Sequence, residues 1–145
     1  MVVVKIKKIK DNAILPNYAH EGDAGVDLYS TEDYVLRPGE RTLVSTGIKI
    51  ALPLGYEAQV RPKSGLALKS GLSVCNTPGT VDAGYRGEVG VIVINHGSDE
   101  YKIETGSKIA QMVFTNVEQA QFEEVSELDE TTRNDGGFGS TGLRW

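Results

Sequence analysis

The sequence predicts an all-β fold, a sandwich or closed barrel of short strands, with one short helix. Three observations lead to this prediction. Apolar and β-branched residues alternate with polar residues over several short segments. Turn-forming clusters such as RPGE, NTPGT and NHGSDE recur about every ten residues, which is typical of many short strands. Helical patterns are confined to two brief stretches.

Five segments are the clearest strand candidates. Residues 2–9 and 47–52 alternate in part, whereas residues 56–60, 89–94 and 109–117 are rich in β-branched and aromatic side chains. Within the fourth, residues 91–94 (VIVI) are apolar at consecutive positions, which predicts that both faces of that strand are buried. The second face would meet another subunit or, alternatively, the second layer of a sandwich.

Residues 64–69 (SGLALK) form the predicted helix, and residues 117–121 are a weaker candidate. Pro62 is expected to end a strand, and Ser64 to act as the helix N-cap. A helix N-terminus with free N–H groups, a serine hydroxyl and the neighbouring Lys63 makes an anion site. The alternative is a plain capped turn without a ligand.

Composition narrows the possible functions. The 145 residues, 39% hydrophobic and 24% charged, fit one globular domain, and no apolar run is long enough for a membrane span. The start of the chain lacks signal-peptide features and Cys75 is the single cysteine, so we expect a cytoplasmic protein. The net charge of −5 argues against nucleic-acid binding. His20 and His96 lack zinc-ligand spacing, which argues against a zinc enzyme.

The composition changes near residue 118. From there to residue 135 the chain has seven acidic residues and one cation, Arg133, and glycines follow. We therefore divide the single domain into a β-barrel core (residues 1–117), an acidic linker and strand (118–132) and a mobile glycine-rich arm (133–145). The G-x-G-x-x-G pattern at residues 137–142 is accidental, because only three residues follow it. The arm is either a disordered tail or a strip of phosphate donors in which Phe138 stacks on a base.

Two carboxylates and an amide are further candidates. Asp82 follows two β-branched residues and precedes a tight turn with Tyr85 close behind, where a carboxylate can position and deprotonate water. Asp27 interrupts the strand-like residues 24–30, and Gln111 lies inside an apolar strand, where a buried polar group needs a partner. Each one, taken singly, is also compatible with a structural role.

Taken in order, five segments resemble the five signature motifs of the homotrimeric dUTP pyrophosphatase (dUTPase) family. AGVDLYS (24–30) resembles the first motif, PKSGLALKSG (62–71) the second and NTPGTVDAGYRGEV (76–89) the third. GSKIAQMVF (106–114) resembles the fourth and RNDGGFGSTG (133–142) the fifth. Five ordered motifs over nearly the whole chain are far more specific than any one alone.

Two positions depart from the family pattern. Lys63 stands where the family usually has arginine, which keeps the charge but loses the bidentate fork. Asn134 stands where glycine usually follows the arm arginine. Asparagine tolerates left-handed backbone better than most residues, so we expect the arm still to close.

The resemblance implies a jelly-roll-like β-barrel (β-clip) subunit in a homotrimer. Three active sites would be shared between subunits, and the C-terminal arm of one subunit would close over a site built by the others. The implied reaction is Mg²⁺-dependent hydrolysis of dUTP to dUMP and pyrophosphate. The expected partners are therefore dUTP and two further copies of the chain, without nucleic acid or membrane.

The resemblance also implies roles for individual residues. Asp82 would be the general base for the water that attacks the α-phosphate, and Asp27 would support Mg²⁺ through water while the triphosphate holds the ion. Tyr85 would lie under the deoxyribose and exclude a 2′-hydroxyl. The other implied substrate contacts are Lys63, Ser64, Gly65 and Gln111 at the phosphates, Asn76, Thr80 and Val81 with the following hairpin at the uracil, and Arg133, Phe138, Gly139, Ser140 and Thr141 in the arm.

Two other functions fit part of the pattern. A dCTP deaminase, including the bifunctional kind that also hydrolyses dUTP, shares the fold and the trimeric site. The glycine-rich arm with Phe138 and the Ala83-Gly84-Tyr85 run favour the pyrophosphatase. A non-enzymatic trimeric β-protein on the same scaffold would not need to keep the base, the phosphate serine and the arm arginine together.

Overall fold

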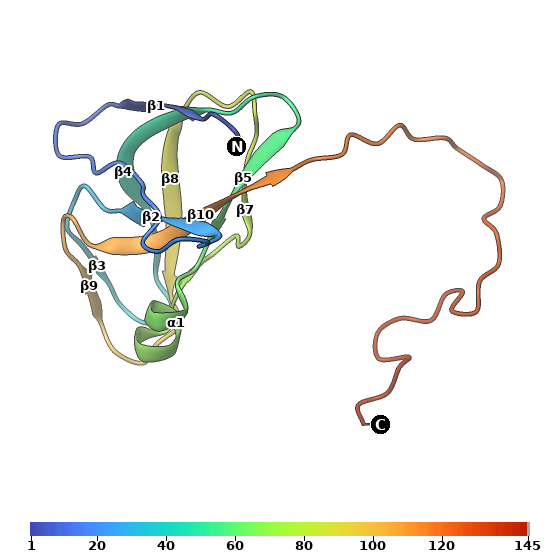
Figure 1. Cartoon of the computed structure of the whole chain (residues 1–145). Helices are drawn as coiled ribbons and strands as arrows, with labels where there is room; N and C mark the ends of the chain where they lie inside the picture. Colours follow the sequence, from blue (N-terminus) through green and yellow to red (C-terminus); the bar gives the residue numbers. More distant parts are fainter. Residues whose placement is uncertain (145) are drawn as a thin grey trace.

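Ten strands and one helix form the regular part of residues 1–144, which are the residues described by this computed structural model (Figure 1). The strands are β1 (Lys5–Lys8), β2 (Gly25–Tyr29), β3 (Tyr34–Leu36), β4 (Arg41–Ala51), β5 (Tyr56–Arg61), β6 (Leu72–Val74), β7 (Gly79–Val81), β8 (Glu88–Asn95), β9 (Tyr101–Ile103) and β10 (Lys108–Asn116). The helix is α1 (Ser64–Ser70). The all-β prediction with one short helix is confirmed.

The strands pair in two four-stranded antiparallel sheets and one two-stranded ribbon. One sheet has the order β1-β4-β8-β6, the other has the order β2-β10-β5-β7, and β3 pairs with β9. Buried side chains from both larger sheets, such as Leu28, Val44, Val91 and Met112, belong to one apolar core. Strand periodicity explains this packing, because alternate residues of β8 point inward.

The single chain buries only one face of residues 91–94, so the second layer of a sandwich is wrong as the cover of the other face, and its burial against another subunit stays a prediction. Val91 and Val93 are buried, whereas Ile92 and Ile94 are only half-buried. Leu43, which pairs with Ile92 on the same face, is 65% exposed. The outer face is incompletely covered because residues 1–144 place no second sheet over it.

Two local predictions near α1 and β10 also need correction. Lys63, not Ser64, is the N-cap of α1, and its side chain makes no capping hydrogen bond. The helix ends at Gly71, whose φ of 71° is left-handed and whose N–H donates to the Ala67 carbonyl. Residues 117–121 are not helical but extended and largely exposed, because they have no neighbour on which an apolar face could pack.

The chain leaves the barrel after β10 (Figure 1). The N–H of Val117 donates to the Gly55 carbonyl at 2.9 Å, and residues 118–144 form neither helix nor strand. The strand expected within residues 118–132 is therefore absent from the single chain, since a strand needs a partner that this segment lacks here. Trp145, the last residue of the predicted arm, lies outside the described residues.

No helix within residues 1–144 has the length and hydrophobicity that crossing a membrane requires.

Candidate active site

A buried carboxylate with two lysine partners lies in the middle of β2, where this strand pairs with β10. Asp27 of β2 is 7% exposed. Lys63 pairs with its Oδ1, and Lys108 pairs with its Oδ2 at 2.8 Å. Burial alone would raise the pKa of Asp27, but the hydrogen bonds from Lys108 and Lys63 outweigh it and hold the pKa below its ordinary value. The carboxylate is therefore ionised and fixed in orientation.

Strand register places Gln111 beside this cluster. In the antiparallel ladders Gln111 lies opposite Asp27 on β2 and opposite Arg61 on β5. Its Nε2 donates to the Pro62 carbonyl at 2.9 Å, so the polar partner expected for this side chain is present. A Cβ at Gly25 would overlap the Gln111 Oε1, and the glycine therefore leaves the room that the amide occupies.

These side chains line a pocket of 360 Å³ with polar walls. Its lining also includes His20 and Asp23, whose carboxylate accepts a hydrogen bond from the His20 backbone N–H at 2.9 Å. The donors that face the pocket are two ammonium groups and one amide. Such donors suit phosphate oxygens. We refer to this hollow as the polar pocket.

A second hollow of 270 Å³ brings together four of the predicted uracil and sugar contacts, and we call it the flat pocket after the flat uracil ring expected there. Asn76, Thr80, Val81 and Tyr85 line it together with apolar side chains of β4, β5, β6 and β8. The Tyr85 hydroxyl donates to the Glu88 carbonyl at 2.9 Å. Apolar walls with a few polar groups are typical of a small-molecule site.

Gly87 makes the position of Tyr85 possible. A Cβ at Gly87 would overlap the Tyr85 hydroxyl oxygen, so a larger residue would displace the ring. Asp82 and Tyr85 also form a tight turn, in which the Tyr85 N–H donates to the Asp82 carbonyl at 3.1 Å. The predicted turn after Asp82 is confirmed.

The predicted hairpin after Asn76 is wrong for the single chain. β7 pairs with β5, whereas β8 pairs with β4 and β6, so the segment between them connects two sheets. Asp82 lies exposed at the end of β7 and lines neither pocket. Ser64 and Gly65 are exposed at the start of α1 and also lie outside both pockets.

The two pockets share no lining residue, so one subunit does not assemble the predicted site. Sequence reasoning missed Lys108, although it belongs to the GSKIAQMVF segment. It also missed the close approaches at Gly25 and Gly87, because each depends on a side chain that the fold places against the glycine.

The described part of the arm, residues 133–144, forms turns of its own and lines neither pocket. The Asn134 Oδ1 accepts a hydrogen bond from the Thr131 N–H at 2.8 Å, and the Asn134 N–H donates to the Thr131 hydroxyl at 2.9 Å. The Arg133 Nε donates to the Gly136 carbonyl at 2.8 Å. Asn134 has a φ of 47°, which confirms that it adopts the left-handed backbone expected of it. The predicted contacts Phe138, Gly139, Ser140 and Thr141 are exposed.

The carboxylates of the barrel suit Mg²⁺ only when substrate phosphates supply further ligands of the ion. Within residues 1–144, no three His, Cys, Asp or Glu side chains gather closely enough to hold a metal ion. Asp27 already has two lysine partners. Mg²⁺ commonly keeps several waters and binds through one or two carboxylates plus substrate phosphates, and this arrangement suits that mode.

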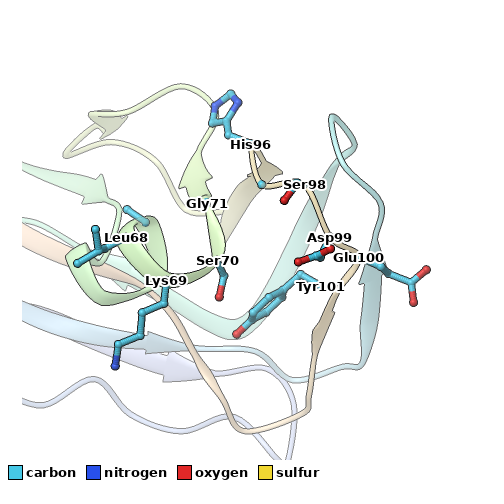
Figure 2. Close-up of a pocket in the computed structure, with 11 residues that line it drawn as sticks. Leu68, Lys69, Ser70, Gly71, His96, Ser98, Asp99, Glu100 and Tyr101 are labelled. Atoms are coloured by element: carbon cyan, nitrogen blue, oxygen red, sulfur yellow. The ribbon is translucent and has the colours of Figure 1, made fainter.

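A larger hollow than either pocket, of 520 Å³, lies between the end of α1 and the turn after β8 (Figure 2). The side chains of Lys69, His96 and Glu100 point in different directions rather than toward a common point (Figure 2). Its close backbone packing, with the His96 N–H donating to the Gly71 carbonyl at 2.9 Å, is structural. Size alone therefore does not identify the site.

Apolar walls with a few placed polar groups, as in the flat pocket, and a separate polar pocket with ammonium and amide groups are features of small-molecule binding sites. The family model of dUTPase matches residues 11–142. The chain therefore belongs to the dUTPase family.

Known relatives agree over nearly the full length. The chain is 58% identical over 139 residues to a deoxyuridine 5′-triphosphate nucleotidohydrolase of Clostridium tetani, and the match covers 96% of each chain. A dUTPase mutant of Staphylococcus bacteriophage 80alpha with dUpNHpp has a TM-score of 0.91 at 27% identity, and the match covers 97% of this chain and 99% of that one.

A dUTPase mutant from phage phi11 of S. aureus, described with a structural Mg(II) ion, has a TM-score of 0.80 at 26% identity. That match covers 86% of this chain and 97% of the phage chain. The barrel with one short helix is therefore the dUTPase fold.

Proposed function

We propose that this protein hydrolyses dUTP to dUMP and pyrophosphate. The observation that carries the proposal is the pair of separate pockets, one with donors for phosphates and one shaped for a ring, in a member of the dUTPase family. The relatives named for this reaction match the chain over nearly its whole length, which supports the same substrate here.

The active form is a homotrimer in which each site is built from different subunits. Three features of the single chain support this assembly. The two pockets are separate, residues 133–144 of the arm line neither of them, and the outer face of β8 and β4 leaves Leu43, Ile92 and Ile94 incompletely covered. In the trimer the flat pocket of one subunit meets the polar pocket of a second, and an arm closes over both.

Asp82 is the general base of the proposed reaction. Its exposed carboxylate at the end of β7 takes a proton from water as the water oxygen bonds to the α-phosphorus. The bond from the α-phosphorus to the oxygen that bridges to the β-phosphate breaks, and pyrophosphate leaves. Because phosphoryl transfer needs mainly positioning and charge stabilisation, the barrel and arm need no covalent intermediate.

The polar pocket holds the phosphates. Lys63 and Gln111 donate to their oxygens from the pocket, and Ser64 and Gly65 donate from the start of α1. Mg²⁺, when bound, neutralises part of the triphosphate charge, and Asp27 is the residue that supports it through water. In the arm, Arg133, Ser140 and Thr141 hold the γ-phosphate once the arm has closed, with Gly139 as a backbone contact.

The flat pocket selects the base and the sugar. Asn76, Thr80 and Val81 border the uracil and leave no room for the methyl group of thymine. Tyr85 lies under the deoxyribose, where a 2′-hydroxyl would collide with its ring. Phe138, which is exposed in the single chain, stacks on the uracil after closure.

The deciding experiment is a pyrophosphate-release assay with dUTP, dTTP, dCTP and UTP, with and without Mg²⁺. We expect dUTP to be strongly preferred and Mg²⁺ to be required. Asp82→Asn should lower kcat about a thousandfold, within the range for loss of a general base. Asp99→Asn, at an exposed carboxylate outside both pockets, is the matched control and should act like wild type.

Three outcomes contradict the proposal. Equal turnover of dUTP and dTTP contradicts the proposed selection for uracil. An unchanged rate in Asp82→Asn contradicts the role of Asp82 as general base. A uracil-containing product from dCTP shows instead a deaminase of the same fold.

A further inference from the structure

Asp27 has one lysine on each carboxylate oxygen, and the two lysines come from different elements. Lys63 follows β5 and pairs with Oδ1, whereas Lys108 opens β10 and pairs with Oδ2. The Asp27 side chain is 10% exposed, against 29% for Lys63 and 48% for Lys108. One lysine is enough to neutralise the buried Asp27 carboxylate, so the second lysine is an additional positive charge.

A β-bulge brings Lys108 to this position. Lys108 pairs with Tyr29 and Ala110 pairs with Leu28, so two residues of β10 correspond to one step of β2. In a regular ladder the position opposite Tyr29 would fall to Ile109, and Lys108 would point to the opposite face. Bulges turn side chains in this way and are frequent beside active sites.

Lys63 has two possible partners, Asp27 and a substrate phosphate. In the proposed function its ammonium donates to a substrate phosphate, yet in the single chain it is paired with Asp27. Moving that ammonium away would leave a buried carboxylate unpaired next to a triphosphate. An unpaired buried charge is strongly unfavourable, and the repulsion from the phosphates adds to it.

We propose that Lys108 is a positioning residue that holds the Asp27 carboxylate in place while Lys63 moves to the substrate phosphates. Lys108 stays on Oδ2 throughout, and Oδ1 becomes free to accept hydrogen bonds from water around the triphosphate. The inference rests on the proposed function, because it takes a triphosphate as the occupant of the polar pocket.

A crystal structure of the full-length protein with the dUTP analogue dUpNHpp tests the exchange directly. We expect the Lys108 Nζ to remain within hydrogen-bonding distance of Asp27, with the Lys63 Nζ on a phosphate oxygen. The inference is overturned if Lys63 stays on Asp27, or if Lys108 itself moves to a phosphate. This readout does not depend on how any variant folds.

Variants give a second, independent test. Lys108→Met keeps most of the unbranched side chain without its charge and should weaken dUpNHpp binding, measured by calorimetry, about tenfold, as expected for loss of a partner that orients a ligand-binding group. Lys108→Arg should restore binding to within about twofold, because its guanidinium can still pair with a carboxylate. Lys69→Ala, at an exposed lysine in the last turn of α1, is the control and should bind like wild type.

A double-mutant cycle separates positioning from a general structural effect. In an Asp27→Asn background, Lys108→Met should cause little further loss of binding, because the group that it positions is gone. Wild-type affinity in Lys108→Met, or equal losses in both backgrounds, overturns the inference. The proposed function fails separately, if the wild-type protein does not hydrolyse dUTP.

Discussion

The barrel and the arm hold their proposed site residues by different means. In the barrel, Asp27 and Gln111 are fixed by strand register and by bonds to neighbouring elements, two lysines for the first and the Pro62 carbonyl for the second. In the arm, the hydrogen bonds of Arg133 and Asn134 stay between residues 131 and 136. Phe138 is fully exposed.

This difference separates preorganised residues from residues that are recruited. The barrel groups have already lost their conformational freedom on folding, so they can orient phosphates at little further cost. The arm must still be ordered over a site. The conformational entropy lost in this step is offset only by contacts with bound substrate. In return, the arm can exclude water during the reaction and release the product afterwards.

The largest effect on activity should come from removing the arm. Deletion of residues 133–145 should leave a folded trimer but lower kcat/KM for dUTP at least about a hundredfold, because Arg133, Phe138 and the exclusion of water are lost together. Size-exclusion chromatography measures the oligomeric state, thermal melting measures the stability of the fold, and steady-state kinetics measure kcat/KM. Deletion of residues 143–145 alone, beyond the last arm motif, is the control. An unchanged turnover number in the longer deletion would show that the barrel suffices.

A smaller effect should come from disturbing one preorganised side chain. In Gly87→Ala the new Cβ displaces the Tyr85 ring, because it would occupy the space of the hydroxyl end of that side chain. We expect kcat/KM for dUTP to fall about tenfold, as for loss of a positioning contact, and the preference for dUTP over UTP to fall with it. The melting temperature should stay close to that of wild type, since Tyr85 is exposed.

A second background checks that Tyr85 is the cause. When Tyr85 is first replaced by alanine, Gly87→Ala should have little further effect on either substrate, because the ring that it displaces is absent. Equal losses in both backgrounds would place the effect in the backbone of the turn and not in the ring.

Much of the barrel could be predicted because strand periodicity and turn residues are local signals. Residues 56–60, 89–94 and 109–117 lie within or next to β5, β8 and β10. Contacts between residues far apart in the chain were harder to predict from the sequence. The position of Lys108 depends on a bulge in the pairing of β10 with β2, and register between strands far apart in the chain leaves no trace at one position.

Three predictions concern segments whose neighbours are missing from the single chain. The apolar VIVI run predicted two buried faces, and the single chain covers only one of them. Residues 117–121 contain a helical pattern but are not helical, because they have nothing to pack against. Burial of the second VIVI face against another subunit and the strand within residues 118–132 stay predictions for the assembled protein.

The smallest effect should come from the backbone of the arm itself. Asn134 has a φ of 47°, and its side chain accepts a hydrogen bond from the Thr131 N–H. Asn134→Ala forces a residue without that bond into left-handed backbone, which costs about 1 kcal/mol and corresponds to about a fivefold rise in KM for dUTP. Asn134→Gly keeps the backbone freedom and should stay within about twofold of wild type. If both variants match wild type, the turn at Asn134 is not part of the closed state, and the arm is ordered by substrate contacts alone.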